Sequence, residues 1–406
     1  MPRQLGTPRP STRSPLADTD SDSTGLPCDE RQGKLLQWVQ RGAARLDPIK
    51  ARRRLAHVIS PSGESVEARA PTGASNDGIG DAKPHVPTSA DVFAVAARPT
   101  TEQQRVSMTL SCADAASIPK VDNAGRFETH GGVDVQIMHN GLKVVRGGYY
   151  GDWMAEIITG LKGHHEPQEE LVFYEILKRI DSVRPAMLEL GCFWAYYSCW
   201  FVTNFPHGVA VAAEPDLDHL AVGRRNAEIN GLPVRFHQAA SARSGTANVT
   251  LTSELDPSVR YSVPARTPAE LMDLEELERV DVLHLDIQGF ELETLEATSA
   301  AVQAGRIRFL VVSTHHHLIC GNPMIHGQCL EWIESMNGHV IAEHSVAESF
   351  SGDGLIAASF DERDVDFTVP VSVNRSTTSL FQPPEVDLAA LTMAYDRLCE
   401  TIVRDD

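Results

Sequence analysis

From residue 186 onward, short apolar runs alternate with longer stretches whose apolar residues recur at helical spacing. The runs at 186–190, 208–213 and 280–285 have the length and composition of buried strands. Strands that alternate with helices are typical of a parallel sheet, because parallel neighbours need a crossover connection. The pattern therefore predicts an α/β fold with a doubly wound, mainly parallel sheet. The predicted strands are 186–190, 208–213, 233–238, 247–252, 260–265, 280–285 and 309–312, and the predicted helices are 194–204, 215–229, 268–277, 291–304 and 326–336.

Two further apolar runs, at 340–342 and 355–358, follow the last predicted helix. No helical pattern separates them, so we expect an antiparallel pair at the C-terminal edge of the sheet. Upstream of the alternating region, an Asn-Gly pair at 140–141 between two apolar stretches predicts a β-hairpin. Helices are predicted after it, at 152–162 and 166–181.

These patterns divide the chain into four regions. Residues 1–120 are rich in Pro, Ser, Thr, Gly and Ala, and we expect them to be largely disordered, with a possible basic helix at 33–59. That helix is either a contact for an acidic partner or membrane surface, or a partly solvated terminal helix. Residues 121–182 are predicted as a hairpin and helical lead-in or lid, 183–382 as the main α/β domain, and 383–406 as a C-terminal helix.

Composition restricts the classes of function. The 406 residues have a formal net charge of −19, which argues against a general nucleic-acid-binding protein. None of the seven cysteines forms a Cys-x-x-Cys pair, so no zinc ribbon or disulfide framework is indicated. No apolar stretch is long enough for a membrane span, and no signal-peptide pattern is present at the N-terminus. We therefore expect a cytoplasmic protein, of open oligomeric state, without an integral membrane segment.

The ends of the first two strands of this domain predict a nucleoside-binding site. The first strand ends on Glu189-Leu190-Gly191, and the second ends on Glu214, whose carboxylate suits the two hydroxyls of a ribose. A pyrophosphate needs a glycine-rich turn for close approach of the backbone, but here Gly191 is followed by the bulky segment 192–195. A cofactor without phosphates, S-adenosylmethionine, is therefore favoured over a dinucleotide.

Two later strand ends supply candidates for catalysis. Asp286 follows the strand 280–285, and three histidines follow the strand 309–312. A histidine is a suitable base for a substrate hydroxyl because its pKa lies near neutrality. The candidate bases are His164, His165, His315, His316 and His317. Two other roles stay open for these side chains: a divalent-metal site of Asp286, His315 and His317, since alternate residues of a strand share a face, and plain contacts to loops or substrate.

Several of these segments, taken in order, resemble the FkbM-type methyltransferases over roughly residues 130–360. The segments that carry the resemblance are Glu166-Pro167, Leu188-Glu189-Leu190-Gly191, Tyr196-Tyr197-Ser198, Glu214-Pro215, Asn226, Asn230-Gly231, Ala239 to Gly245 and Leu285-Asp286-Ile287-Gln288-Gly289-Phe290-Glu291. The resemblance implies the class I S-adenosylmethionine-dependent fold and O-methylation of sugars or polyketide-like metabolites. The sequence differs from the family pattern in two places. Residues 192–195 stand where family members usually have Ala-Asn-x-Gly, and Gln288 stands where they usually have Glu.

The resemblance also implies roles for individual residues. Glu189 and Gly191 frame the methionine end of the cofactor, with Tyr197 and Ser198 beside them; Glu214 binds the ribose. Asp286 lies by the methyl donor, and Glu291 opens the helix after it. The expected cofactor-binding residues are Glu189, Gly191, Tyr197, Ser198, Glu214 and Asp286, the expected catalytic residues are Asp286, His315, His316 and His317, and the expected substrate-binding residues are His164, His165, Glu166, Glu291 and Asp353.

We therefore predict an S-adenosylmethionine-dependent O-methyltransferase that acts on a hydroxyl of a sugar-containing or secondary metabolite, with a small molecule or glycan as acceptor and no bound metal. The altered turn and Gln288 motivate a first alternative, a non-catalytic binding or scaffold protein that retains the fold. A second alternative, disfavoured by the single glycine of the turn, is a nicotinamide-dependent oxidoreductase.

Overall fold

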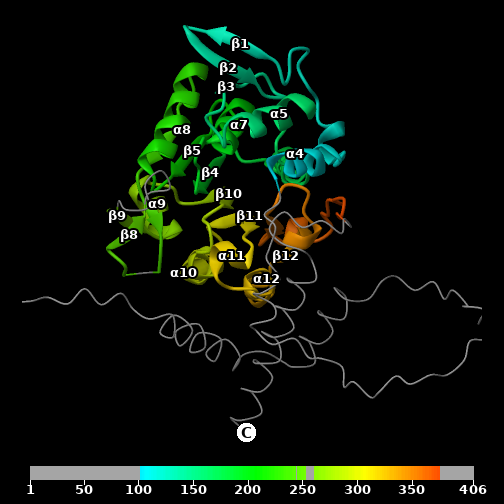
Figure 1. Ribbon diagram of the computed structural model, residues 1–406. Helices are drawn as coiled ribbons and strands as arrows, with labels where there is room; N and C mark the ends of the chain where they lie inside the picture. The colour runs from blue at the N-terminus through cyan, green and yellow to red at the C-terminus, as the bar shows by residue number, and fades with distance from the viewer. Residues whose placement is uncertain (1–100, 244, 253–259, 375–406) are drawn as a thin grey trace, which may run out of the picture. The chain divides into compact units, whose positions relative to one another are not determined.

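A seven-stranded sheet with the strand order β12-β13-β11-β10-β4-β5-β6 organises the structure (Figure 1). Five neighbouring strands from β11 to β6 run parallel, whereas β13 is antiparallel to both β11 and β12. This confirms the predicted doubly wound, mainly parallel sheet with antiparallel C-terminal edge strands. The strands of this sheet are β4 (Ala186–Leu190), β5 (Val209–Ala213), β6 (Arg235–His237), β10 (Val280–Leu285), β11 (Ile307–Thr314), β12 (His339–His344) and β13 (Gly354–Ser359).

The computed structural model describes residues 101–243, 245–252 and 260–374. All of them fall within one of the two units of the chain, Ala70–Arg397. The predictions of disorder for residues 1–100, of a basic helix at 33–59 and of a helix at 383–406 lie outside the described residues. In the described part, no helix combines the length and apolarity needed to cross a bilayer.

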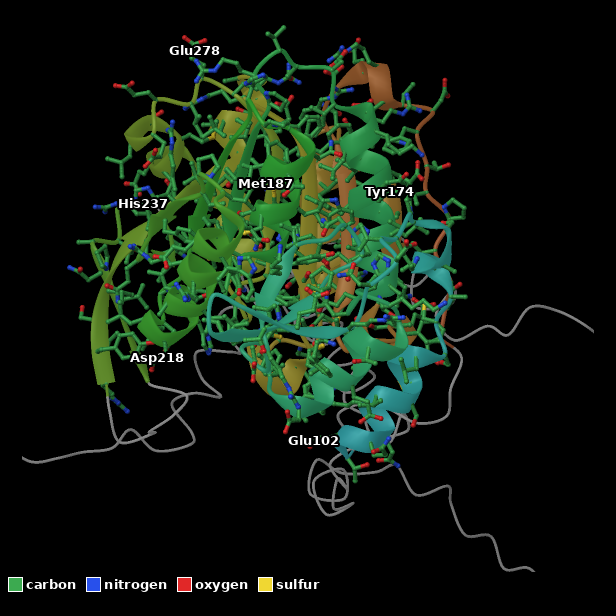
Figure 2. The ribbon with its side chains drawn as sticks, turned by 90° about the horizontal axis from the view of Figure 1, so that it is seen from above. Glu102, Tyr174, Met187, Asp218, His237 and Glu278 are labelled. Carbon is green, nitrogen blue, oxygen red and sulfur yellow. The ribbon has the colours of Figure 1, made fainter. Side chains whose placement is uncertain are left out.

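Helices cover both faces of the sheet, because side chains alternate along each strand and both faces are apolar. Met187 of β4, labelled in Figure 2, is fully buried on the face covered by α5, α6 and α7. Leu188 and Leu190 pack on the opposite face with α9, α10 and α12. The helices around the sheet are α5 (Asp152–Gly160), α6 (Pro167–Arg179), α7 (Tyr196–Asn204), α8 (Leu217–Asn230), α9 (Pro268–Leu274), α10 (Glu291–Gln303), α11 (His317–Cys320) and α12 (Ile325–Ser335).

The lead-in before the main domain contains the predicted hairpin. Strands β2 (Val133–Ile137) and β3 (Lys143–Val145) pair antiparallel, and β1 (Phe127–His130) adds a third strand beside β2. Two asparagines of α8 tie this sheet to the domain, since the Oδ1 atoms of Asn230 and Asn226 accept hydrogen bonds from the backbone N–H groups of β3.

One predicted disordered stretch contains a helix. Residues 101–120 were expected to be disordered, but α4 spans Glu102–Leu110 and a short 3-10 helix follows at Asp114–Ser117. A capping box between Thr101 and Gln104 satisfies the first N–H groups of α4, and Val106 is buried in the main core. The prediction was wrong here because α4 has few apolar residues and depends on contacts with distant parts of the chain.

The two short strands predicted between β6 and α9 form a separate small sheet. Strand β9 (Arg260–Arg266) pairs antiparallel with β8 (Asn248–Thr252) and parallel with β7 (Ala240–Ser241). This sheet follows the carboxyl end of β6 directly and therefore lies beside the strand ends at which the cofactor was predicted.

Candidate functional site

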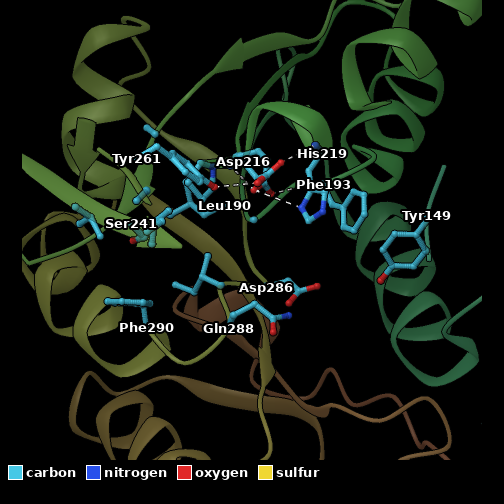
Figure 3. A pocket seen from close by; sticks show the side chains of 18 of the residues that line it. Tyr149, Leu190, Phe193, Asp216, His219, Ser241, Tyr261, Asp286, Gln288 and Phe290 are labelled. Carbon is cyan, nitrogen blue, oxygen red and sulfur yellow. Dashed lines mark hydrogen bonds and ion pairs between the residues drawn. The ribbon is translucent and has the colours of Figure 1, made fainter. Parts of the chain in front are cut away.

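A cavity opens at the carboxyl ends of β4, β5 and β10, where a doubly wound fold binds nucleoside ligands (Figure 3). It measures about 970 Å³ when the open solvent at its mouth is included. In Figure 3, Phe193 and His219 lie on one side, Ser241 and Phe290 on the other, and Asp286 with Gln288 between them. We call it the first cavity. Its lining is Tyr149, Tyr150, Leu190, Gly191, Phe193, Glu214, Pro215, Asp216, His219, Ala239, Ala240, Ser241, Val249, Leu251, Tyr261, Asp286, Ile287, Gln288 and Phe290.

The turn after β4 has a strained backbone. Gly191, Phe193 and Ala195 all have positive φ angles, at 77°, 40° and 56°. Residues that carry a side chain rarely adopt this left-handed backbone conformation. A β-carbon on Gly191 would overlap the carbonyl group of Asp286, so glycine is required where this turn meets the end of β10. Left-handed φ at non-glycine residues concentrates at functional sites, and this turn borders the first cavity.

Glu214 is oriented by the backbone of two turns. Its Oε2 accepts a hydrogen bond from the N–H of Phe193 at 3.0 Å, and its Oε1 accepts one from the N–H of Asp216 at 2.9 Å. Burial raises the pKa of Glu214 to about 7, against the lowering effect of these two N–H groups. A carboxylate has about four lone-pair sites, so two remain for hydroxyl groups of a bound ribose. The site therefore fits the cofactor predicted from the sequence.

The small sheet adds a wall of the first cavity that the sequence did not predict. The hydroxyl of Tyr261 on β9 donates a hydrogen bond to Oδ2 of Asp216 at 2.9 Å, and Asp216 also caps α8. Opposite it, the rings of Phe193 and His219 stack with centroids 3.6 Å apart. A helix-capping pattern at Asp216 is readable in the sequence, but its contact with Tyr261 arises only in the folded chain.

A second cavity adjoins the first. It encloses about 590 Å³, and most of its lining comes from the lead-in and from α4. Tyr149, Tyr150, Asp286 and Gln288 line both cavities. The full lining of the second cavity is Arg105, Thr109, Tyr149, Tyr150, Trp153, Met154, Ile157, His165, Glu166, Asp286, Gln288, Ile319, Ser351, Gly352 and Asp353. Two cavities that share lining residues are suited to bind two reactants that react with each other at the shared wall.

His315 is enclosed by carboxylates. Its Nδ1 lies 2.6 Å from Oε1 of Glu291, and its Nε2 lies 3.0 Å from Oδ1 of Asp286 and 3.7 Å from Oδ1 of Asp353. Burial alone would lower its pKa, but these carboxylates raise the pKa well above its ordinary value. The same Nε2 lies 2.9 Å from the side-chain nitrogen of Gln288, and the raised pKa favours the imidazolium form. The side chain of His315 is fully buried behind the wall of the second cavity.

The other two histidines of the triplet lie outside both linings. Strand β11 ends at Thr314, His316 caps α11 by accepting a hydrogen bond from the N–H of Leu318, and His317 begins that helix. The expectation that His315 and His317 share a strand face was therefore wrong, because the strand ends before them. Asp286 and His315 lie side by side at the ends of β10 and β11.

A second group of buried charges lies at the start of α6. Glu170 is fully buried, its Oε1 accepts a hydrogen bond from the N–H of His165 at 2.7 Å, and its Oε2 contacts Nδ1 of His164. His165 and Glu166 line the second cavity, as Asp353 does, whereas His164 and Glu291 line neither. Three of the five expected substrate residues are therefore brought together there.

Of the expected cofactor residues, Gly191, Glu214 and Asp286 line the first cavity. Glu189, Tyr197 and Ser198 lie behind it. The Oε2 of Glu189 accepts hydrogen bonds from the backbone N–H of Ser198, at 2.9 Å, and from its hydroxyl group. This carboxylate therefore satisfies the N-terminus of α7 rather than facing the cavity.

One group of histidine and carboxylate side chains in the described residues has metal-ligand spacing: His139, His164 and Glu170, whose ligand atoms lie within 4.8 Å of one another. The rings of His139 and His164 are stacked, with centroids 4.4 Å apart and planes 14° apart. An imidazole binds a metal in the plane of its ring, so two nearly parallel rings direct their lone pairs along parallel lines. This arrangement does not converge on one ion.

Comparison with protein families agrees with the resemblance predicted from the sequence. Residues 179–339 match the family model described as methyltransferase FkbM domain. This range contains β4 to α12 and the strand ends that line the first cavity, but it excludes α4, α5 and most of α6. No curated protein matches the chain.

Solved structures with similarity to the chain include several methyltransferases. TrmK of M. capricolum, in complex with S-adenosyl-homocysteine, is 15% identical over 49% of this chain and 74% of that chain, with a TM-score of 0.31. Precorrin-6y C5,15-methyltransferase of Geobacter metallireducens is 16% identical over 47% of this chain and 87% of that chain, with a TM-score of 0.31. The METTL16 MTase domain is 13% identical over 48% of this chain and 69% of that chain, with a TM-score of 0.33. Because the TM-scores are this low, these structures carry no argument here, and the conclusion about the fold rests on the strand order and on the family match.

Proposed function

We propose that the protein uses S-adenosylmethionine to methylate a hydroxyl oxygen of a sugar-containing or secondary metabolite. The match of residues 179–339 to the methyltransferase FkbM domain supports the proposal. In this proposal the cofactor binds in the first cavity and the acceptor in the second. The transfer takes place at their shared wall, beside Tyr149, Tyr150, Asp286 and Gln288.

The observation that carries the proposal is this shared wall. A methyl transfer requires the donor carbon and the acceptor oxygen to approach in line, so donor and acceptor sites must adjoin without overlapping. Asp286 borders both spaces from the carboxyl end of β10, where the fold places reacting groups. Its carboxylate is therefore suited to orient the acceptor beside the donor.

The chain's own residues supply cofactor binding and orientation. S-Adenosylmethionine, when bound, supplies an activated methyl group on a positively charged sulfur. Glu214 accepts hydrogen bonds from the ribose hydroxyls, and Gly191 keeps the turn after β4 close to the end of β10. The negative charge of Asp286 favours a cationic donor on the shared wall.

The second cavity combines aromatic rings with carboxylates. The rings of Tyr150 and Trp153 are stacked with centroids 5.9 Å apart, and they offer an apolar surface for a sugar ring or a carbocyclic acceptor. Glu166 and Asp353 accept hydrogen bonds from hydroxyl groups. This mixture supports a hydroxylated acceptor rather than a purely apolar one.

The structure favours a different role for His315 from that of a base. A base must reach the proton that it removes and must be unprotonated, but His315 is buried behind Asp286 and its pKa is raised by Asp353, Asp286 and Glu291 against the effect of burial. We propose that His315 positions Asp286 and that a carboxylate takes the acceptor's proton.

The proposal is tested by methyl transfer from isotopically labelled S-adenosylmethionine to a panel of methyl glycosides, phenols and hydroxylated macrolactones, with products identified by mass spectrometry. We expect a methyl ether from at least one acceptor. Binding of S-adenosylhomocysteine without transfer to any acceptor would support the alternative of a scaffold protein. Transfer to nitrogen or carbon atoms alone would overturn O-methylation.

A further inference from the structure

We propose that Glu166 is the catalytic residue that takes the proton from the acceptor hydroxyl, and that His165 and Glu170 position it. The inference rests on the proposed function, because it assigns a base within the second cavity. Neither the match to the family model nor the resemblance read from the sequence assigns a base; Glu166 itself lies before the matched range, which begins at residue 179.

Glu166 has the location that a base requires. It lines the second cavity but not the first, so it borders the proposed acceptor space and not the donor space. Its side chain is 13% exposed, which removes most competing water. It also occupies the N-cap position of α6, one residue before Pro167, so its main chain is held by a helix end.

Two contacts fix the carboxylate of Glu166. Its Oε2 lies 3.2 Å from Nε2 of His165 and accepts a hydrogen bond of 3.2 Å from the hydroxyl of Tyr197 on α7. The other oxygen, Oε1, has neither of these partners and is free to accept a proton. A base that is already held in place loses little entropy when the substrate arrives.

Glu170 acts on the charge of His165 and holds its main chain. Nδ1 of His165 lies 2.7 Å from Oε1 of Glu170 in an ion-pair contact without hydrogen-bond geometry, and the backbone N–H of His165 donates to the same oxygen. His165 is 1% exposed and Glu170 is fully buried. Burial would lower the pKa of His165, but Glu166 and Glu170 raise it to about 10. His165 is therefore an imidazolium between two carboxylates at neutral pH.

Several charged groups face Glu166 from other elements. Burial raises the pKa of Glu166 above its ordinary value, His165 lowers it, and neighbouring carboxylates raise it further. A higher pKa strengthens a carboxylate as a base. The groups that act on it include His165 and Glu169 near the start of α6, Tyr197 on α7, Tyr149 in the lead-in, Asp286 after β10 and Asp353 before β13. Arg105 of α4 lines the same cavity.

Asp353 is the competing base of the second cavity. Burial raises its pKa to about 7, which suits a base at neutral pH. It lies, however, in the loop before β13, and Nε2 of His315 is 3.7 Å from its Oδ1. Asp286 borders the donor cavity as well, and its Oδ1 lies 3.0 Å from Nε2 of His315. Glu166 is the carboxylate that two ordered elements hold toward the acceptor alone.

The step balances without another reactant. The acceptor oxygen forms a bond to the methyl carbon while the bond between that carbon and sulfur breaks, and the electron pair of the broken bond stays on sulfur. The hydroxyl proton moves to Oε1 of Glu166, which becomes a neutral carboxylic acid. The products are a methyl ether and S-adenosylhomocysteine, and Glu166 returns its proton to solvent after they leave.

The first test measures the charge of His165 in the ligand-free protein. Long-range ¹H–¹⁵N spectra of ¹⁵N-histidine-labelled protein, with His165→Gln for assignment, should show a cationic imidazole from about pH 6 to 9. Glu170→Gln should lower the pKa of His165 by at least about one unit, because the charge of Glu170 is one of the causes that raise it. A neutral His165 at pH 7 in the wild-type protein would overturn the positioning role, whatever the acceptor is.

The second test measures turnover against pH with an acceptor identified by the transfer assay. Glu166→Gln should lower kcat by roughly 100-fold or more, since general bases contribute about 10² to 10⁴. It should also abolish the rise of kcat with pH, while Glu166→Asp restores part of both. The Kd for S-adenosylhomocysteine should stay within about twofold, because Glu166 lies outside the first cavity.

Two comparisons make the outcome decisive. Glu175→Gln, on the same helix but paired with Lys178 outside both cavities, should behave like the wild type. Asp353→Asn should retain the pH dependence of kcat. If Asp353→Asn removes that dependence and Glu166→Gln does not, Asp353 is the base and the inference fails. Absence of transfer by the wild-type protein would instead contradict the proposed function, and the histidine spectra still decide the charge of His165.

Discussion

Gly191 lies against the main-chain carbonyl of Asp286, and this contact joins the turn after β4 to the end of β10. The backbone N–H of Asp286 donates to the carbonyl of Leu190 at 2.9 Å in the same place. The two turns therefore form one unit at the edge of the first cavity. A change in either turn displaces the other.

Replacing Gly191 by alanine should disrupt this unit. The added β-carbon collides with the Asp286 carbonyl, and the φ of 77° costs a further 1–2 kcal/mol or so for an L-residue. We expect a lower midpoint in urea unfolding and at least about tenfold weaker binding of S-adenosylhomocysteine by calorimetry.

Gly327→Ala is the matched control for this prediction. Gly327 lies in α12, nothing approaches its position within 4 Å, and its φ is ordinary. Alanine there should leave binding unchanged and raise stability by up to about 1 kcal/mol, because alanine favours helices. If both glycine variants bind the ligand like the wild type, the close approach at Gly191 has no role in the site.

Glu214 should make cofactor binding depend on pH. Its pKa is raised to about 7 by burial in the free protein, so it is protonated below that value and ionised above it. Only the ionised form accepts hydrogen bonds with both oxygens, so affinity for S-adenosylhomocysteine should fall by up to about tenfold per pH unit below pH 7 and level off above it.

Calorimetry across this range checks the prediction. Glu214→Gln should bind more weakly at pH 8 and show a much flatter pH dependence, because the amide does not titrate. Glu228→Gln, on the exposed side of α8, should reproduce the wild-type curve. A Glu214→Gln variant that keeps the full slope would assign the titration to another group.

Much of the fold was predictable because burial leaves a simple signal. The strand β4 spans 186–190 as predicted, since every residue in it is buried and the run has no polar interruption except Glu189. The edge strands β12 and β13 were also predicted, because no helical pattern separates them. The helix α4 was missed because its stability comes from a capping box and from one buried valine, Val106, rather than from an apolar stripe.

The candidate site was predictable only at strand ends. Gly191, Glu214 and Asp286 directly follow or end apolar runs, so a parallel topology brings them to one edge. Glu189 alternates with Leu188 and Leu190 along β4, and its side chain therefore points to the other face, where it meets Ser198. The alternation of side chains along a strand predicts this orientation of Glu189, whereas the family resemblance predicted that Glu189 binds the cofactor.

The walls of the two cavities depend on tertiary contacts that no local pattern encodes. Tyr261 reaches Asp216 from a strand some 45 residues later in the chain. Arg105 and Trp153 come from α4 and α5, outside the segment that matches the family model. These residues become candidates only when the fold places their helices over the strand ends.

Trp153 should contribute to acceptor binding and not to cofactor binding. It lines the second cavity only, and its ring lies beside Tyr150 and under the guanidinium of Arg105, 5.7 Å from the ring centroid. Trp153→Ala should raise the KM for the acceptor about tenfold, in line with the ~1.5 kcal/mol of one aromatic contact. The Kd for S-adenosylhomocysteine should stay the same.

Phe127→Ala is the matched control for Trp153. Phe127 is an exposed aromatic residue on β1 and lines neither cavity. Steady-state kinetics should show wild-type values for both substrates. A Trp153→Ala variant with an unchanged KM for the acceptor would remove the aromatic surface from the binding site.

A buried ion pair at the start of β11 should make a large contribution to stability. Asp364 is 1% exposed and receives two hydrogen bonds of 3.0 Å from Arg308, which is 4% exposed. Asp364→Asn keeps the shape but leaves a buried guanidinium with too little negative charge, so the free energy of unfolding in urea should fall by roughly 3–5 kcal/mol. Glu228→Gln breaks an exposed pair with Arg225 and should cost less than about 1 kcal/mol. Equal effects of the two variants would mean that Asp181, the other carboxylate at Arg308, compensates for the lost charge.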